Sequence, residues 1–92
     1  MSKLGRREYY LFDISDKNLE SLIDIIKSTL TPPPKYSVNV YPGKYGLNII
    51  IEISGSDEGK IKKIDLEISA KVLEICEKRG IGVHLMEPLE II

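Results

Sequence analysis

Two apolar stripes at helical spacing are the clearest pattern in this 92-residue chain. The first predicts an amphipathic helix over residues 16–30 that ends before the prolines 32–34, because proline lacks an amide N–H and disfavours helix in its predecessor. The second predicts a longer helix over residues 58–79, closed by Gly80 in the position glycine favours after a helix. The stripes are Leu19, Leu22, Ile23, Ile26 and Leu30, then Ile61, Ile64, Ile68, Val72 and Ile75.

Four further segments are rich in β-branched and aromatic residues, which is typical of strands. They cover residues 8–14, 36–41, 47–53 and 81–85. The second and third flank the turn sequence 42–46 and therefore predict a hairpin.

The resulting order, β-α-β-β-α-β, predicts an α+β fold of the ferredoxin-like type. Its four-stranded antiparallel sheet has the spatial order 4-1-3-2, with both helices on one face. We expect one domain over residues 8–92, preceded by a flexible basic tail at residues 1–7. Residues 86–92 are open to three placements: they extend strand four, pair with a neighbouring chain, or cover the sheet face without helices.

The sheet face without helices is the first candidate site. Side chains alternate along strands, and we expect Tyr10, Phe12 and Ile14 to face the helices, although alternation alone does not identify which phase is buried. The opposite phase then forms an apolar interaction surface, since contiguous exposed apolar area marks binding sites. We assign Tyr9, Leu11, Tyr41, Ile50, His84 and Met86 to this interface.

A local cluster of cations is the second candidate site. Thirteen Lys and Arg against 14 Asp and Glu give a net charge of -1, which excludes a globally basic nucleic-acid coat but permits a basic patch. The predicted topology gathers seven cations at one edge, where they would contact the phosphates of structured RNA or DNA. They are Lys3, Arg6, Arg7, Lys35, Lys60, Lys62 and Lys63.

Catalytic and metal-binding motifs are not evident, and we expect no enzymatic activity, metal or cofactor. Residues 55–61 resemble a P-loop in position, but they have one residue too few between the glycines and Ile61 where a hydroxyl residue is needed. They read instead as a helix cap. His84 is the only histidine and Cys76 the only cysteine, too few ligands for an ordinary zinc site, and we expect Cys76 to be a buried thiol.

Residues 30–79, a proline turn, an apolar hairpin and a long helix, resemble the small dimerising subunit of the KEOPS tRNA-modification complex. That family ends at its second helix, whereas this chain continues through Val83 to Ile92, so we do not assign the chain to it. We expect an assembly module, either a homodimer or a small subunit of a larger complex. The alternative is an accessory nucleic-acid-binding subunit in RNA processing or tRNA modification.

Composition adds an expected setting. The chain has neither a secretory signal nor an apolar run of membrane-spanning length, and its one cysteine cannot form an internal disulfide. We therefore expect a cytoplasmic protein without membrane contact. The absence of Gln and Trp, with abundant Lys and Glu, resembles thermophile composition.

Overall fold

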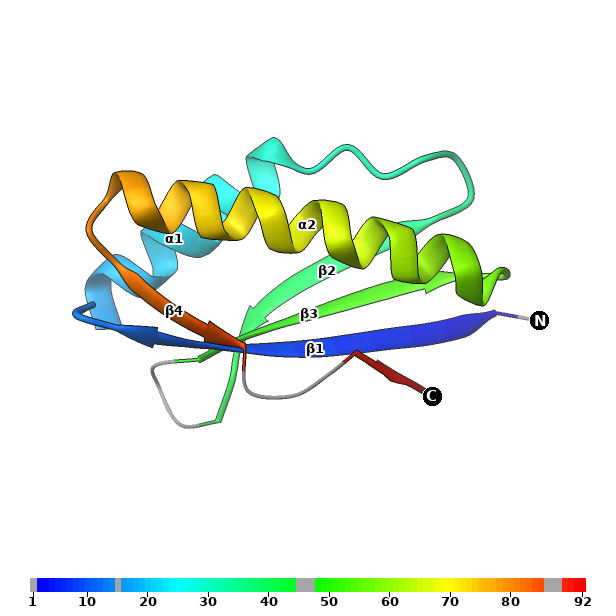
Figure 1. The fold of residues 1–92 in the computed structure, drawn as a ribbon, viewed down its shortest axis with the longest axis horizontal. Helices are drawn as coiled ribbons and strands as arrows, with labels where there is room; N and C mark the ends of the chain where they lie inside the picture. The colour runs from blue at the N-terminus through cyan, green and yellow to red at the C-terminus, as the bar shows by residue number, and fades with distance from the viewer. Residues whose placement is uncertain (1, 15, 45–47, 86–88) are drawn as a thin grey trace.

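Two helices lie on one face of an antiparallel sheet in the computed structural model, which describes residues 2–14, 16–44, 48–85 and 89–92 (Figure 1). The predicted ferredoxin-like α+β fold is confirmed. Its elements are β1 (Lys3–Phe12), α1 (Asp16–Thr29), β2 (Ser37–Pro42), β3 (Asn48–Gly55), α2 (Glu58–Lys78), β4 (Gly82–Leu85) and β5 (Glu90–Ile91).

The strand order β2-β3-β1-β4 is the predicted 4-1-3-2 order. The central strand β1 runs antiparallel to β3, from the pair Lys3↔Gly55 to the pair Tyr10↔Asn48. On its other edge β1 pairs first with β5 and then with β4. Of residues 86–92, the described residues 89–92 therefore take the placement closest to an extension of strand four, since they return to the same edge of β1; residues 86–88 lie outside the described residues.

The prediction of a flexible tail over residues 1–7 is wrong for residues 3–7. These residues form the first half of β1, because β3 continues to Gly55 and β5 supplies a partner on the other side. Leu4 and Ile92 add two backbone hydrogen bonds there, from N–H of Ile92 to O of Leu4 at 2.8 Å and from N–H of Leu4 to O of Ile92 at 3.4 Å. Backbone groups paired on both sides hold this basic segment in the sheet.

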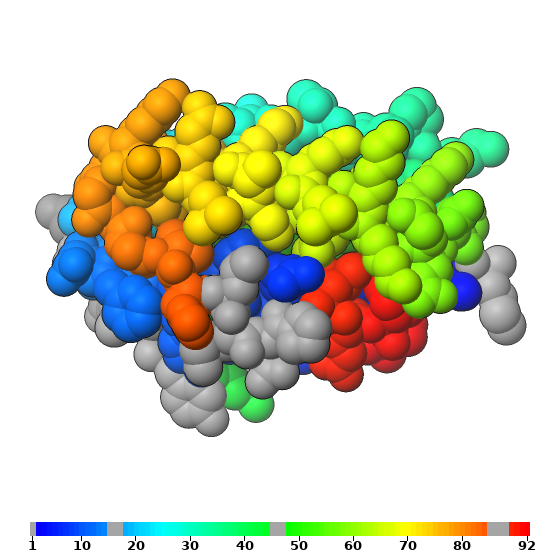
Figure 2. Space-filling view, in the orientation of Figure 1, coloured from blue at the N-terminus to red at the C-terminus, as the bar shows by residue number. Residues whose placement is uncertain are grey.

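The core lies between the helices and the sheet. Gly5 lies at a close approach between β1 and α2, since a Cβ there would lie 2.5 Å from Cγ2 of Ile61 and 3.3–3.4 Å from Leu89 and Ile91. In Figure 2 the β5 residues lie directly below the N-terminal part of α2. The fully buried large side chains are Tyr9, Leu11, Leu22, Ile26, Val40, Ile49, Ile51, Ile53, Ile61 and Val72.

Both ends of α2 follow from its sequence. Asp57 is the N-cap, and its Oδ1 accepts from the backbone N–H of Gly59 at 2.8 Å and of Lys60 at 3.3 Å. The predicted capping role of this segment is confirmed. Past the C-terminus, Gly80 has a φ of 68°, a conformation that glycine adopts without steric cost. Among the described residues no helix is both long and apolar enough to cross a membrane.

Candidate functional site

The sheet face without helices, here called the open face, differs from the predicted one along β1. Tyr9 and Leu11 were assigned to this face, but they are 0% and 2% exposed and lie in the core. The assignment is wrong because Tyr9 pairs with Ile49 and Leu11 with Val83. Residues paired in this way share one face of a sheet, and that face is the one covered by the helices.

Tyr10 and Phe12 therefore occupy the open face, contrary to the prediction that they face the helices. Phe12 is 54% exposed and lies opposite Gly82, whose missing side chain leaves room for the ring. Tyr10 pairs with Asn48 on one side and with His84 on the other.

The remaining members of the predicted interface have different outcomes. Tyr41 and the exposed His84 lie on the open face as expected. Ile50 shares that face, paired with Tyr41 and Glu8, but it is only 4% exposed. Met86 lies outside the described residues. Of the predicted apolar centre, Leu11 thus lies in the core and Ile50 is almost fully buried. The rings on the open face are those of Tyr10, Phe12, Tyr41 and His84, which we call the aromatic patch.

Next to the aromatic patch the open face is charged. Arg6 lies opposite Glu52 on β3 and Glu90 on β5, so that one cation has a carboxylate residue on each side. Burial raises the pKa of the Tyr41 phenol, and the neighbouring Glu52 raises it further. Asn48, the buried first residue of β3, donates from Nδ2 to Oε1 of Glu8.

The predicted basic edge is divided by the structure. Arg7 is the clearest correction: it faces the helices and pairs with Asp65 of α2, with Nη2 2.7 Å from Oδ2 and Nε 2.9 Å from Oδ1. Its side chain is 15% exposed and that of Asp65 4%. This hydrogen bond raises the pKa of the Arg7 guanidinium. A cation held in this way is not available to phosphate.

A second polar pair continues the same line one helical turn along α2. The hydroxyl groups of Tyr9 and Ser69 are 2.9 Å apart and share a hydrogen bond. Burial raises the pKa of Tyr9 to about 12. Arg7 and Tyr9 are two residues apart on β1 and Asp65 and Ser69 four apart on α2, so the two pairs fix the helix against the strand.

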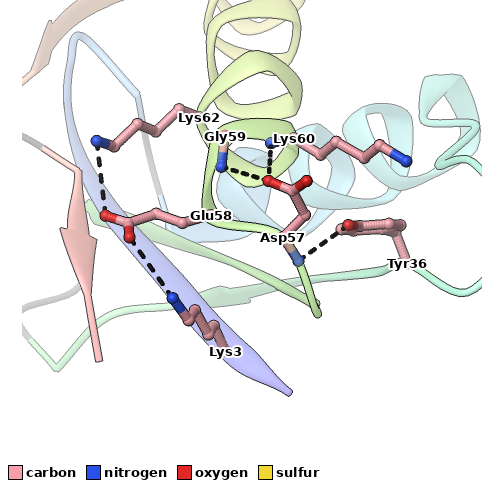
Figure 3. A network of polar contacts seen from close by, with 7 residues as sticks. All are labelled: Lys3, Tyr36, Asp57, Glu58, Gly59, Lys60 and Lys62. Carbon is pink, nitrogen blue, oxygen red and sulfur yellow. Dashed lines mark hydrogen bonds and ion pairs between the residues drawn. The ribbon is translucent and has the colours of Figure 1, made fainter. Parts of the chain in front are cut away.

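Three of the other predicted cations, Lys3, Lys60 and Lys62, separate to two sides of α2 (Figure 3). Lys3 and Lys62 lie on one side and share Glu58, at 3.7 Å and 3.5 Å between Nζ and the carboxylate oxygens. Lys60 extends to the other side, toward Tyr36. Lys60 and Lys63 take part in no ion pair within the described part of the chain.

Lys60 and Lys63 border a hollow of about 530 Å³ between α2 and the proline-rich connection from α1 to β2. A smaller hollow next to it shares four lining residues and extends the depression to Lys71. We call the combined feature the proline groove. Its lining residues are Leu30, Thr31, Pro32, Pro33, Pro34, Tyr36, Val38, Lys60, Lys63, Ile64, Glu67, Ile68 and Lys71.

Cys76 and His84 do not form a site together. Cys76 is buried within the core, and burial raises the pKa of its thiol. His84 lies on the opposite face of the sheet. Within the described ranges no three His, Cys, Asp or Glu residues are grouped to hold a metal ion.

Two features, the polar pairs of α2 and the proline groove, were not predicted from the sequence, although the first has a signal in it. Asp65 and Ser69 fall inside the apolar stripe of the second helix, and a carboxylate in that position needs a buried partner. The proline groove had no comparable signal, because it depends on how the connection 30–36 folds against α2.

No family model and no curated protein matches the chain. Solved structures do share its fold. A C-terminal segment of the alpha subunit of aIF2 from Pyrococcus abyssi has a TM-score of 0.69 and 14% identity over 95% of this chain, which spans about half (51%) of that one. Rv0793 from Mycobacterium tuberculosis has a TM-score of 0.55 and 12% identity, covering 100% of this chain and 91% of its own.

The de novo designed protein Foldit4 has a TM-score of 0.60 and 11% identity, covering 100% of this chain and 97% of its own. At such identities the likeness shows the fold alone. Function has to be argued from the surfaces of this chain.

Proposed function

We propose that the protein is a non-catalytic assembly module that forms a homodimer through the aromatic patch of its open face. The observation that carries the proposal is the exposed ring of Phe12, 54% accessible on a sheet face that no helix covers. Tyr10 lies two residues before it on the same strand. Aromatic side chains are enriched in protein interfaces, since they bury a large area with little conformational entropy.

The energy available from Phe12 is substantial. A phenylalanine side chain has roughly 200 Å² of surface, so about half of it, on the order of 100 Å², remains in water. At about 25 cal/mol per Å², its burial contributes about 2.5 kcal/mol per copy. A symmetric dimer contains two copies of each contact.

A standard interface buries about 800 Å² per partner. The molecule measures 38 × 22 × 17 Å, so an interface of that size would take up most of one side of it. A cytoplasmic setting belongs to the same proposal, because the only cysteine is a buried free thiol.

The test is the solution mass of Phe12→Glu compared with wild type. Light scattering at about 10–100 μM, above the micromolar to picomolar dissociation constants of standard-size interfaces, should give wild-type protein close to twice 10.4 kDa. Phe12→Glu should give 10.4 kDa, because the interface would then bury two unpaired carboxylates. Circular dichroism should show an unchanged fold, since Phe12 is half exposed.

Leu66→Glu is the matched control. Leu66 is 68% exposed on α2, and the substitution makes the same change from apolar to acidic on the helix layer. It should leave the dimer intact. A monomeric wild type would contradict the proposal, and so would a dimer that Leu66→Glu dissociates and Phe12→Glu does not.

A further inference from the structure

The proline groove has an uneven distribution of charge. Lys60 and Lys63 border its larger hollow, whereas Glu67 is the only carboxylate among its lining residues. At the far end, Nζ of Lys71 donates to the backbone oxygen of Thr29 at 3.4 Å, a contact that leaves its charge uncompensated. The groove therefore carries a net positive charge, although the whole chain carries -1.

The groove also presents a fixed aromatic ring. Oη of Tyr36 accepts a hydrogen bond from the backbone N–H of Asp57 at 3.1 Å. The ring lies against Gly55, where a Cβ would be only 1.9–2.1 Å from two ring carbons. The absence of a side chain at Gly55 thus leaves room for the ring at the end of β3, and the hydrogen bond is a second contact that holds it.

Ring and cations occur on the same side of α2. In Figure 3 the side chain of Lys60 extends toward Tyr36, whereas Lys62 extends the opposite way toward Glu58. Pro33, Pro34 and Ile64 also line the hollow beside the ring. An apolar, aromatic floor with ammonium groups at the rim matches a base on its sugar-phosphate backbone, since bases stack on rings and phosphates pair with cations.

We propose that the proline groove binds a segment of single-stranded nucleic acid, with one base against Tyr36 and the adjoining phosphates at Lys60 and Lys63. The site lies on the helix layer, away from the open face, so it is independent of the proposed dimer interface. An acidic peptide would use the same ammonium groups but would gain nothing from the ring, which is why a nucleic acid is the better match.

The test is fluorescence anisotropy of the full-length protein with 5′-labelled U12 and dT12 oligonucleotides at 50 and 200 mM salt. Wild type should bind, and more weakly at the higher salt. Lys60→Glu/Lys63→Glu should weaken binding by at least about tenfold at 50 mM salt. It should also lower the slope of log K against log salt by about 1.4, because each phosphate contact with a single strand contributes about 0.7.

Lys3→Glu/Lys62→Glu is the matched control for charge. It reverses the same number of charges, but on the Glu58 side of α2, and it should change affinity less than threefold. For the ring, Tyr36→Leu should weaken binding about tenfold through lost stacking. Tyr36→Phe, which keeps the ring, should retain affinity, and a urea unfolding curve of each variant shows that it is folded.

Three results would overturn the proposal. One is a wild type that binds neither oligonucleotide at 50 mM salt. Another is equal weakening by Lys3→Glu/Lys62→Glu and Lys60→Glu/Lys63→Glu, which would mean that the oligonucleotides respond only to net charge. The third is a 12-residue oligoglutamate that binds more tightly than U12 and dT12 with the same dependence on Lys60 and Lys63, which would assign the groove to an acidic peptide.

Discussion

The buried ion pair between Arg7 and Asp65 gives the sharpest prediction about stability. The perturbation is a double-mutant cycle that replaces each residue by an apolar one of similar length, Arg7→Met and Asp65→Leu, alone and together. Each single change removes one charge and leaves the other behind in the core. The double change removes both charges and leaves apolar side chains between β1 and α2.

The burial of the two side chains sets the order of the effects. Removing one partner of a buried pair costs about 3–5 kcal/mol. Asp65 is 4% exposed and Arg7 15%, so a carboxylate without its guanidinium is worse solvated than the reverse. We therefore expect Arg7→Met to lower the free energy of unfolding by about 4–5 kcal/mol and Asp65→Leu by about 3 kcal/mol. Both values lie within the range for such pairs.

The double variant should be within about 1 kcal/mol of wild type, since apolar replacements of buried ion pairs are often neutral. The coupling energy of the cycle is then several kcal/mol. Urea unfolding followed by far-UV circular dichroism at 25 °C gives the four free energies by linear extrapolation.

Two outcomes would refute this reasoning. Additive single effects in the double variant would show that the two residues do not act as a pair. Single effects below about 1 kcal/mol would show that the pair is solvated like a surface salt bridge.

Two further predictions concern Tyr9 and Asp57. The folded-state pKa of Tyr9, about 12 against an ordinary 10, gives stability that is complete below pH 10 and declines by about 2–3 kcal/mol as the pH rises to 12. Urea unfolding at pH 8 and pH 11 should show that Tyr9→Phe loses less stability than wild type between the two pH values. At pH 8 the variant should be about 1 kcal/mol less stable than wild type, because Ser69 loses its hydrogen-bond partner. Equal losses of stability in the two proteins would contradict this. Asp57→Ala should lower the free energy of unfolding by about 1 kcal/mol, because α2 loses its N-cap. Thermal unfolding measures this, with Ser56→Ala as a control that should change little. An unchanged midpoint in Asp57→Ala would exclude the capping role.

The helices show how far the sequence alone reaches. Their stripes predicted residues 16–30 and 58–79, and the structure has Asp16–Thr29 and Glu58–Lys78. Helical periodicity, capping by Asp57 and the turn at Gly80 are local properties, since each depends on residues within one or two turns. The order of these elements was then sufficient to predict the strand order of the sheet.

Strand β1 shows where local information ends. Both phases of its sequence are apolar in part: Tyr9 and Leu11 belong to one, Tyr10 and Phe12 to the other. Only the register against β3 and β4 decides which phase is buried, and a shift of one residue would exchange every side chain between the faces. The prediction for this strand was wrong for that reason, and the candidate interface changed with it.

The predicted cation cluster also shows the difference between local and tertiary information. The predicted topology gathers seven cations at one edge, but the sequence does not say which of them have carboxylate partners. Packing of α2 on β1 brings Asp65 to Arg7, whereas the turn of the helix separates Lys62 from Lys60. Periodic patterns determined the elements and their order, because these depend on neighbours along the chain. The open face, the buried ion pair and the proline groove were decided by tertiary structure, because each depends on contacts between residues far apart in sequence.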